Sequence, residues 1–384
     1  MRCPTWRLRR PAETVVRKLL CAILAGCCLG ASPAKERRLL YVASPGIRNY
    51  VEWGGKGILV YDIDRGHSFV KRIPSPFDDP GGKVENVKGV CASAATRRLY
   101  ITTLSRLACI DLVTERPLWV KALPGGCDRL SITPDGKTLY VPSLEGPHWN
   151  VVDAMTGDVL KRIDVGSGAH NTLCLPSGKR VFMADLRSTT LVGADPTTHE
   201  IVHRVGPFRA PIRPFTMNSA GTLAFVNLNG LLGFEVGDVL AGKMLHRVEV
   251  PGYRPGPVKR HGCPSHGVGL TPDEKELWVV DGSNQRLHVF DATVMPPAYL
   301  ASIELLVDQP GWVTFSLDGA YAYPSTGEVI DTKTRKIVAH LKDEQGHQVQ
   351  SEKLLEIDFA GKVPVRAGDQ FGVGRLSARA TRRP

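Results

Sequence analysis

The 384-residue chain has 42% hydrophobic and 23% charged residues, the composition of an ordinary soluble globular protein, and its formal net charge is +11. Most of the excess charge lies at the two ends, because residues 1–26 hold six Lys or Arg against one Glu and the last ten residues hold four arginines. The body of the chain is close to neutral, so we expect no nucleic-acid partner.

Residues 1–26 have the order of a secretory signal peptide: a basic stretch, the short apolar run Leu19–Gly26, and then small residues. The apolar run is far shorter than the ~20 residues that cross a bilayer. Residues 24–27 also match a bacterial lipobox. Two alternatives stay open: lipidation of Cys27, with anchoring to the outer membrane, or plain cleavage near Ala31 or Ala34. In both, we expect an exported protein in the periplasm or at the cell surface, touching the membrane only through such an anchor.

A strand motif with one aromatic ring recurs along the rest of the chain at intervals of 40 to 59 residues. Several copies follow a Pro-Asp-Gly type of turn, such as residues 133–137, which is typical of a strand hairpin. An apolar pair and an acid follow each ring, and then a Thr/Gly turn and another apolar strand. The rings are Tyr41, Tyr100, Tyr140, Phe182, Phe225, Trp278 and Tyr323.

This pattern predicts an all-β protein, a single seven-bladed β-propeller of four-stranded antiparallel blades over residues 36–362. The first ring, Tyr41, lies almost at the start of the exported chain, so the first blade lacks its inner strand. The strand-like segment Lys353–Phe359 follows the last repeat, and we expect it to supply that strand, because an open ring would leave sheet edges unpaired. We expect residues 374–384 to form a loose basic tail.

The repeats "TPDGKTLYVPSLEG", "SHGVGLTPDEKELWVVD" and "NTLCLPSGKRVFMADL" resemble the bacterial YVTN-type propeller repeat over about residues 38–345. That broad group includes surface-layer-like proteins and lactonases of the 6-phosphogluconolactonase type. No copy contains Tyr-Val-Thr-Asn literally, and no lactonase catalytic set maps onto residues of this chain. The resemblance therefore implies the fold more specifically than any chemistry.

The residues that begin the inner strands of a propeller surround one mouth of its central channel. Alignment of the repeats places there Lys88, Asp128, Arg129, His170, Asn171, Arg213, His266 and Trp312. Arginine offers forked donors to a carboxylate or phosphate, and histidine can act as a base or ligand. We therefore predict a ligand-binding mouth. Its candidate ligand-binding residues are Asp128, Arg129, His170, Asn171, Arg213, His261, His266 and Trp312.

Three functions remain open at this mouth. The first is a binding or interaction scaffold for a small molecule or a protein partner, working as a monomer. The second is a lactonase- or lyase-type enzyme, with catalytic candidates His170, His266 and Arg213. The third is a protein that binds a metal or redox cofactor, although His261, Cys263 and His266 lack a standard metal-ligand spacing. No cofactor is identified, and no metal ligand is assigned.

Two long loops and five cysteines complete the features of interest. Residues 44–57 and 251–263 are unusually long connections that carry aromatic and basic side chains, and they could cap the mouth if both lie on the same face. Of the nine cysteines, five lie beyond residue 28, at wide spacings and without a CxxC pair. We expect most of them to be small buried apolar residues.

Overall fold

The computed structural model describes Met1 and residues 36–77, 80–82, 84–257, 260 and 262–376. The described residues from Glu36 onward form one compact unit by their contacts. The predictions for the signal peptide 1–26, Cys27, His261 and residues 377–384 fall outside the described residues. No helix within the described ranges has the length and hydrophobicity needed to cross a membrane.

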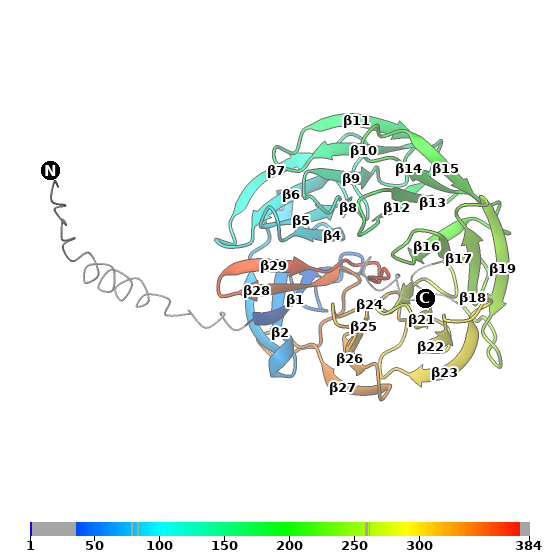
Figure 1. Ribbon diagram of the computed structural model, residues 1–384. Helices are drawn as coiled ribbons and strands as arrows, with labels where there is room; N and C mark the ends of the chain where they lie inside the picture. The colour runs from blue at the N-terminus through cyan, green and yellow to red at the C-terminus, as the bar shows by residue number, and fades with distance from the viewer. Residues whose placement is uncertain (2–35, 78–79, 83, 258–259, 261, 377–384) are drawn as a thin grey trace. The chain divides into compact units, whose positions relative to one another are not determined.

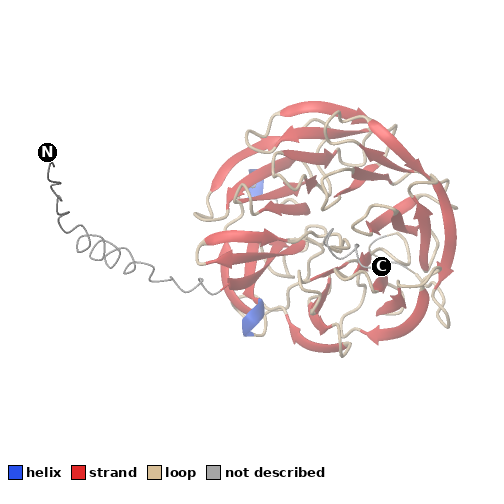
Figure 2. Ribbon diagram, in the orientation of Figure 1, coloured by secondary structure: helices blue, strands red, loops and turns tan. Residues whose placement is uncertain are grey.

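Seven antiparallel sheets surround a common axis, as the repeat predicted (Figure 1). Strands account for nearly all of the regular structure (Figure 2), and the short 3-10 helices η1 (Ile63–Arg65) and η2 (Pro80–Gly82) lie between them. We number the sheets as blades 1 to 7 along the chain. In blades 2 to 7 the first strand lies nearest the axis and the fourth lies outermost (Figure 1).

Blades 2 to 4 each have four strands in consecutive order. Blade 2 contains β4 (Val87–Ser93), β5 (Arg98–Thr103), β6 (Arg106–Asp111) and β7 (Pro117–Ala122). Blade 3 contains β8 (Ser131–Ile132), β9 (Thr138–Pro142), β10 (His148–Asp153) and β11 (Val159–Asp164). Blade 4 contains β12 (Ala169–Cys174), β13 (Val181–Asp185), β14 (Leu191–Ala194) and β15 (Ile201–Val205).

Blades 5 to 7 repeat this arrangement. Blade 5 contains β16 (Ile212–Met217), β17 (Leu223–Leu228), β18 (Gly233–Asp238) and β19 (Lys243–Glu249). Blade 6 contains β20 (Val268–Leu270), β21 (Glu276–Asp281), β22 (Arg286–Asp291) and β23 (Ala298–Glu304). Blade 7 contains β24 (Val313–Phe315), β25 (Tyr321–Pro324), β26 (Glu328–Asp331) and β27 (Lys336–His340).

Blade 1 joins the two ends of the propeller. Its strands β1 (Glu36–Ser44), β2 (Gly57–Asp62) and β3 (Ser68–Ile73) come from the start of the described chain, and β28 (Leu354–Ala360) comes from its end. β28 pairs with β1 in antiparallel register, which confirms the predicted closure. The structure adds a fifth strand that the repeat did not indicate: β29 (Val363–Ala367) pairs with β28 and covers the backbone edge that β28 would otherwise turn toward the axis.

The repeated rings lie on the second strand in blades 2 to 7 and on β1 in blade 1, and all seven are buried. They pack between neighbouring blades, as with Trp278 of blade 6, whose ring meets Phe315 of blade 7 edge-on at 5.7 Å. The phenol of Tyr100 donates to the carbonyl of Ala154 in the next blade, at 2.8 Å. One ring per repeat therefore fills each inter-blade space, which explains the regular spacing in the sequence.

After β29 the chain crosses the axis of the propeller. This crossing segment, residues 368–376, occupies the centre of the ring (Figure 1). The amide of Gln370 bonds to Val90 of β4 and to Leu130 before β8, and the carbonyl of Gly372 accepts from Thr216 of β16 and from Leu270 of β20. The propeller therefore extends past residue 362.

Glycine is required at one point of the crossing segment. Gly372 has φ near +57°, and a Cβ there would lie 2.9 Å from the Cα of Gly269. Two residues further on, the amide of Gly374 donates to the carbonyl of Met217, and that of Arg375 donates to the carbonyl of Pro272. The first two residues of the expected loose tail are thus attached to blades 5 and 6.

Candidate functional site

A cavity of about 650 Å³ opens at the end of the propeller where the inner strands begin. We call it the mouth cavity. Its basic side chains outnumber its carboxylates, with six against two. The basic residues are Arg48, Lys88, Arg129, Arg213, Arg260 and Lys353, and the acidic ones are Glu145 and Glu352.

The structure separates the predicted mouth residues into two groups. Lys88, Arg129, His170, Arg213 and His266 line the mouth cavity, each near the start of the inner strand of its own blade. Both catalytic-candidate histidines therefore face one space. Among the described predicted residues, the others lie in the wall behind it: Asp128, Asn171 and Trp312 are buried and are not part of the lining.

Asp128 and His170 form the first half of a buried polar network. His170 donates from Nδ1 to Oδ2 of Asp128 at 2.6 Å, and Nη1 of Arg129 lies 3.3 Å from Nε2 of His170. The ammonium of Lys88 lies 3.3 Å from Oδ1 of Asp128. Burial opposes ionisation of Asp128, yet His170 and the cations Lys88 and Arg129 hold its pKa below the usual range. Burial lowers the pKa of His170, so the ring is neutral at pH 7.

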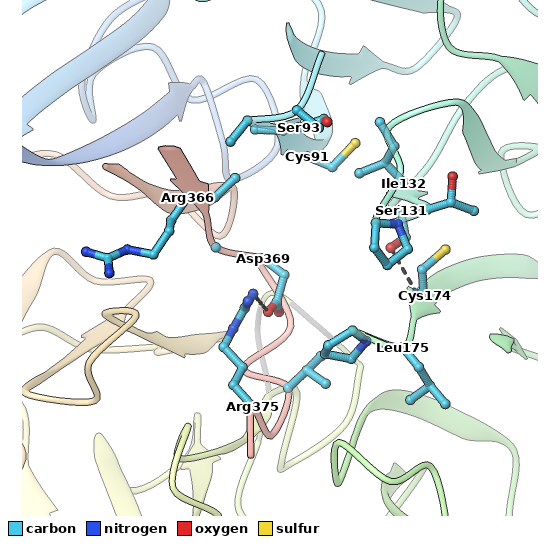
Figure 3. A pocket seen from close by; sticks show the side chains of 18 of the residues that line it. Cys91, Ser93, Ser131, Ile132, Cys174, Leu175, Arg366, Asp369 and Arg375 are labelled. Atoms are coloured by element: carbon cyan, nitrogen blue, oxygen red, sulfur yellow. Dashed lines mark hydrogen bonds and ion pairs between the residues drawn. The ribbon is translucent and has the colours of Figure 1, made fainter. Parts of the chain in front are cut away.

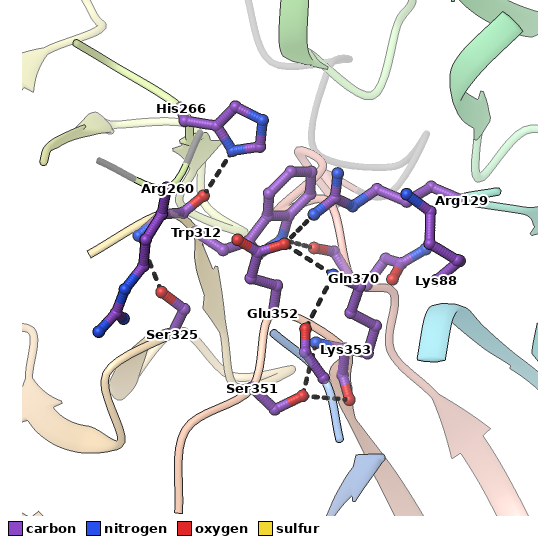
Figure 4. Close-up of polar contacts among 12 residues, drawn as sticks. Lys88, Arg129, Arg260, His266, Trp312, Ser325, Ser351, Glu352, Lys353 and Gln370 are labelled. Atoms are coloured by element: carbon purple, nitrogen blue, oxygen red, sulfur yellow. Dashed lines mark hydrogen bonds and ion pairs between the residues drawn. The ribbon is translucent and has the colours of Figure 1, made fainter. Parts of the chain in front are cut away.

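Arg129 connects the Asp128–His170 pair to the residues just before the closing strand β28 (Figure 4). Its Nη2 is paired with the carboxylate of Glu352, which also accepts from the ammonium of Lys353 at 2.6 Å. The guanidinium face lies over the ring of Trp312 at 4.1 Å. Arg129 and the adjacent residues Glu352 and Lys353, far from Arg129 in sequence, thus neutralise one another in part within the wall of the cavity.

Lys353 is held deep in this wall. Its ammonium donates to the carbonyl of Gly46 at 2.9 Å and to Glu352. Burial, together with the nearby charges of Arg129 and Lys88, lowers the pKa of Lys353 to about 7. The total charge of the mouth therefore changes near neutral pH.

Glu352 and Lys353 were not among the predicted mouth residues. They lie just before the closing strand β28, which follows no Pro-Asp-Gly turn of the repeat. A positional signal was present, since Ser351-Glu352-Lys353 precede β28 as Cys127-Asp128-Arg129 precede the short strand β8. Glu352 and Lys353 hold the mouth position of blade 1, for which no residue was predicted.

The two long loops meet over the mouth. Arg48, from the loop between β1 and β2, donates from Nη2 to the carbonyl of Arg260 at 2.8 Å. The guanidinium of Arg260, from the loop before blade 6, lies over the ring of Trp53 at 4.2 Å. Both loops therefore lie on the same face of the propeller and contribute basic side chains to one cavity.

Arg48, Arg213 and Arg260 account for the excess positive charge. Their side chains bond to neutral oxygens: Arg213 to Oδ1 of Asn229 at 2.5 Å and Arg260 to Oε1 of Gln350 at 3.3 Å. Within the described ranges, none of the three has a carboxylate within ion-pair distance. Burial lowers the pKa of Arg260, although Tyr50 and carboxylates beyond ion-pair distance oppose that shift.

His266 lies across the mouth with a defined orientation. Its Nδ1 is 3.1 Å from the carbonyl of Gly311, and because a carbonyl can only accept, the ring donates from Nδ1. The described residues contain no group of three or more His, Cys, Asp or Glu side chains arranged to hold a metal ion. His261, one of the predicted ligand-binding residues, lies outside the described residues.

A second cavity of about 340 Å³ lies at the opposite end of the propeller, where the inner strands finish (Figure 3). Cys91 and Cys174 line it, beside an ion pair of 2.5 Å between Arg375 and Asp369. Burial raises the pKa of Cys174 to about 12 and that of Cys91 well above its ordinary value, so both thiols stay protonated and weakly nucleophilic. The five cysteines beyond residue 28 all lie in the described part of the chain. Each is a free thiol, and four of them are buried.

No protein-family model matches the chain, and no curated protein sequence matches it. Among solved structures, the fold is similar to Kuenenia stuttgartiensis hydrazine synthase, with a TM-score of 0.55 and 18% sequence identity over 67% of this chain and 81% of that chain. At this identity the similarity shows the propeller fold alone. No family model supports the resemblance to the YVTN-type repeat.

Proposed function

We propose that the protein is an exported binding propeller that holds a small anion in its mouth cavity. One observation carries this proposal: Arg48, Arg213 and Arg260 surround a single cavity, and no carboxylate of the described residues pairs with them. Arg213 and Arg260 are partly buried. A guanidinium that is partly removed from water without a paired counter-ion costs free energy, and a bound anion would offset that cost. A single chain supplies the whole site, so the proposal requires no partner copy.

Binding of inorganic phosphate, sulfate, acetate and citrate, measured by isothermal titration calorimetry at pH 7, tests the proposal. We expect at least one of these anions to bind, and Arg213→Gln to weaken its binding by about tenfold or more, as the loss of a charge-assisted contact predicts. Arg286→Gln is the matched control, because Arg286 lies on β22 outside the mouth and pairs with the exposed Glu304. Absence of binding by all four anions would reject the proposal.

A lactonase- or lyase-type enzyme is the second candidate, and the Asp128–His170 pair favours it. A carboxylate that holds the Nδ1–H of an imidazole leaves Nε2 as the basic atom. In this structure Nη1 of Arg129 occupies that atom at 3.3 Å, so His170 could act as a base only after Arg129 moves. Hydrolysis rates of a panel of lactones would test this, and rates unchanged in His170→Gln would dismiss the candidate.

A further inference from the structure

The repeat places a leucine at one rim position in three consecutive blades. Counting four residues from the buried ring of blades 2, 3 and 4 leads to Leu104, Leu144 and Leu186. All three line the mouth cavity. None of them is fully buried, and Leu104 is 36% exposed. Three neighbouring blades thus present an apolar wall on one half of the mouth.

In blades 5, 6, 7 and 1, which form the other half of the mouth, this rim position does not hold a leucine. It holds Asn229 in blade 5, and glycine or proline in blades 6, 7 and 1. Asn229 is the residue that accepts from Nε of Arg213 at 2.5 Å. Arg260, from the loop between blades 5 and 6, and Arg48, from blade 1, lie on this half as well. The unpaired positive charge and the leucine wall therefore occupy different halves of one cavity.

The positive charges on the leucine half are already paired within the protein. Lys88 pairs with Asp128, and Arg129 pairs with Glu352. Glu145 directly follows Leu144 and places a carboxylate at this edge of the cavity. An anionic group would be repelled from Glu145 and attracted toward the arginines, which defines a direction for a bound molecule.

Resting on the proposed function, we infer that the ligand is an amphipathic organic acid, with its anionic group at Arg213 and Arg260 and its apolar body against Leu104, Leu144 and Leu186. The cavity volume of about 650 Å³ is within the range of pockets that hold small organic molecules. An inorganic anion would use the arginines only and would leave the leucine wall in contact with water. An acid with an apolar body removes that wall from water and adds the free energy of apolar burial.

A series of straight-chain carboxylates separates the two parts of the ligand. Acetate, butyrate, hexanoate and octanoate carry the same head group, and their dissociation constants can be measured by calorimetry at pH 7. We expect the dissociation constant to fall about fourfold for each added methylene until the leucine wall is covered. Hexanamide, which has the chain without the charge, should bind at least tenfold more weakly than hexanoate.

Variants locate the apolar contact. Leu144→Asn combined with Leu186→Asn should remove most of the gain in affinity from acetate to octanoate. Leu118→Asn is the matched control, because Leu118 is exposed on the outer strand β7, and it should leave the whole series unchanged. Circular dichroism of each variant checks that the propeller is folded.

The outcomes distinguish this inference from the proposed function. If acetate binds and chain length has no effect, the apolar part of the inference is wrong and anion binding stands. If neither the carboxylates nor phosphate and sulfate bind, both are wrong. If the affinity rises with chain length equally in the leucine variants, the apolar body lies elsewhere and the assignment to this wall is overturned.

Discussion

The guanidinium carbon of Arg129 lies 4.1 Å from the centre of the Trp312 ring, and the indole nitrogen of Trp312 donates to the carbonyl of Gln370. Arg129 lines the mouth cavity, and Gln370 belongs to the crossing segment. Through Trp312, the residues that surround the mouth are attached to the segment that crosses the axis beneath them. The mouth thus depends on the closing of the propeller as well as on its repeats.

Replacement of Arg129 should destabilise the fold strongly. Arg129→Gln would leave Glu352 buried with one cation fewer, and breaking a buried ion pair from one side costs about 3 to 5 kcal/mol. Urea denaturation would measure the unfolding free energy. Lys121→Gln breaks an ion pair whose two side chains are 37% and 64% exposed, and it should cost less than about 1 kcal/mol. Equal losses in the two variants would contradict this assignment.

The crossing segment should contribute to stability through Phe371. This side chain is 2% exposed and meets the Trp312 ring at 66° with the centroids 5.8 Å apart. Phe371→Ala should lower the unfolding free energy by about 3 to 5 kcal/mol, because it leaves a cavity in the centre of the propeller. Leu376→Ala, at an exposed position of the same segment, should have little effect. Thermal and urea unfolding of both variants would check this, and a near-neutral Phe371→Ala would show that the segment is only loosely attached.

Stability should fall as pH rises from about 4.5 to 7 through the contribution of Glu356. Burial, and then a hydrogen bond with Asp358, raises the pKa of Glu356 from 4.5 to about 7, while Arg38 and the amide of Leu317 oppose that rise. Between these values the folded state keeps a proton that the unfolded state releases, so a higher pH favours unfolding.

Glu356→Gln should flatten this part of the pH profile of the unfolding free energy. The comparison is the difference between the two proteins at each pH, which removes the titration of groups common to both. Glu344→Gln, at an exposed carboxyl whose pKa is lowered to about 2 chiefly by its hydrogen bond with Arg72, should leave the slope between pH 4.5 and 7 unchanged. A slope that persists in Glu356→Gln would assign the proton to another group.

Anion affinity at the mouth should decrease between about pH 6 and 8. Burial lowers the pKa of Lys353 to about 7, so its positive charge is present below this pH and lost above it. An anion in the cavity favours the charged form and therefore binds with uptake of a proton. Calorimetry of one bound anion across this range would measure the effect. In Lys353→Met the affinity should vary less over the same range, and an unchanged profile would exclude Lys353 as the titrating group.

Much of the fold could be predicted because it repeats. One buried ring per blade, as at Tyr140, occupies the same inter-blade space each time, so its spacing in the sequence reports the packing directly. The closing strand was predicted on different grounds, from the missing inner strand of blade 1. The fifth strand, β29, was not predicted, because Val363–Ala367 follows no repeat and its pairing depends only on the edge that β28 offers.

The mouth was predicted in part for the same reason. Arg129, His170, Arg213 and His266 each hold a repeat position at an inner strand, and all four line the cavity. Asp128 shares such a position, yet its carboxylate turns into the wall toward His170. Alignment of repeats locates a residue on a blade but does not determine which way its side chain points.

By itself, the sequence determined the number of blades, the order of their strands and the residues at the start of each inner strand, because these follow from a local pattern of apolar side chains and turns. Only the tertiary structure decided which charges are paired. Glu352 neutralises part of the charge of Arg129 and Lys353, whereas no carboxylate of the described residues forms an ion pair with Arg48, Arg213 or Arg260 at the mouth. Charge pairing depends on distances of a few ångströms between residues far apart in sequence, and these distances are set only when the ring closes.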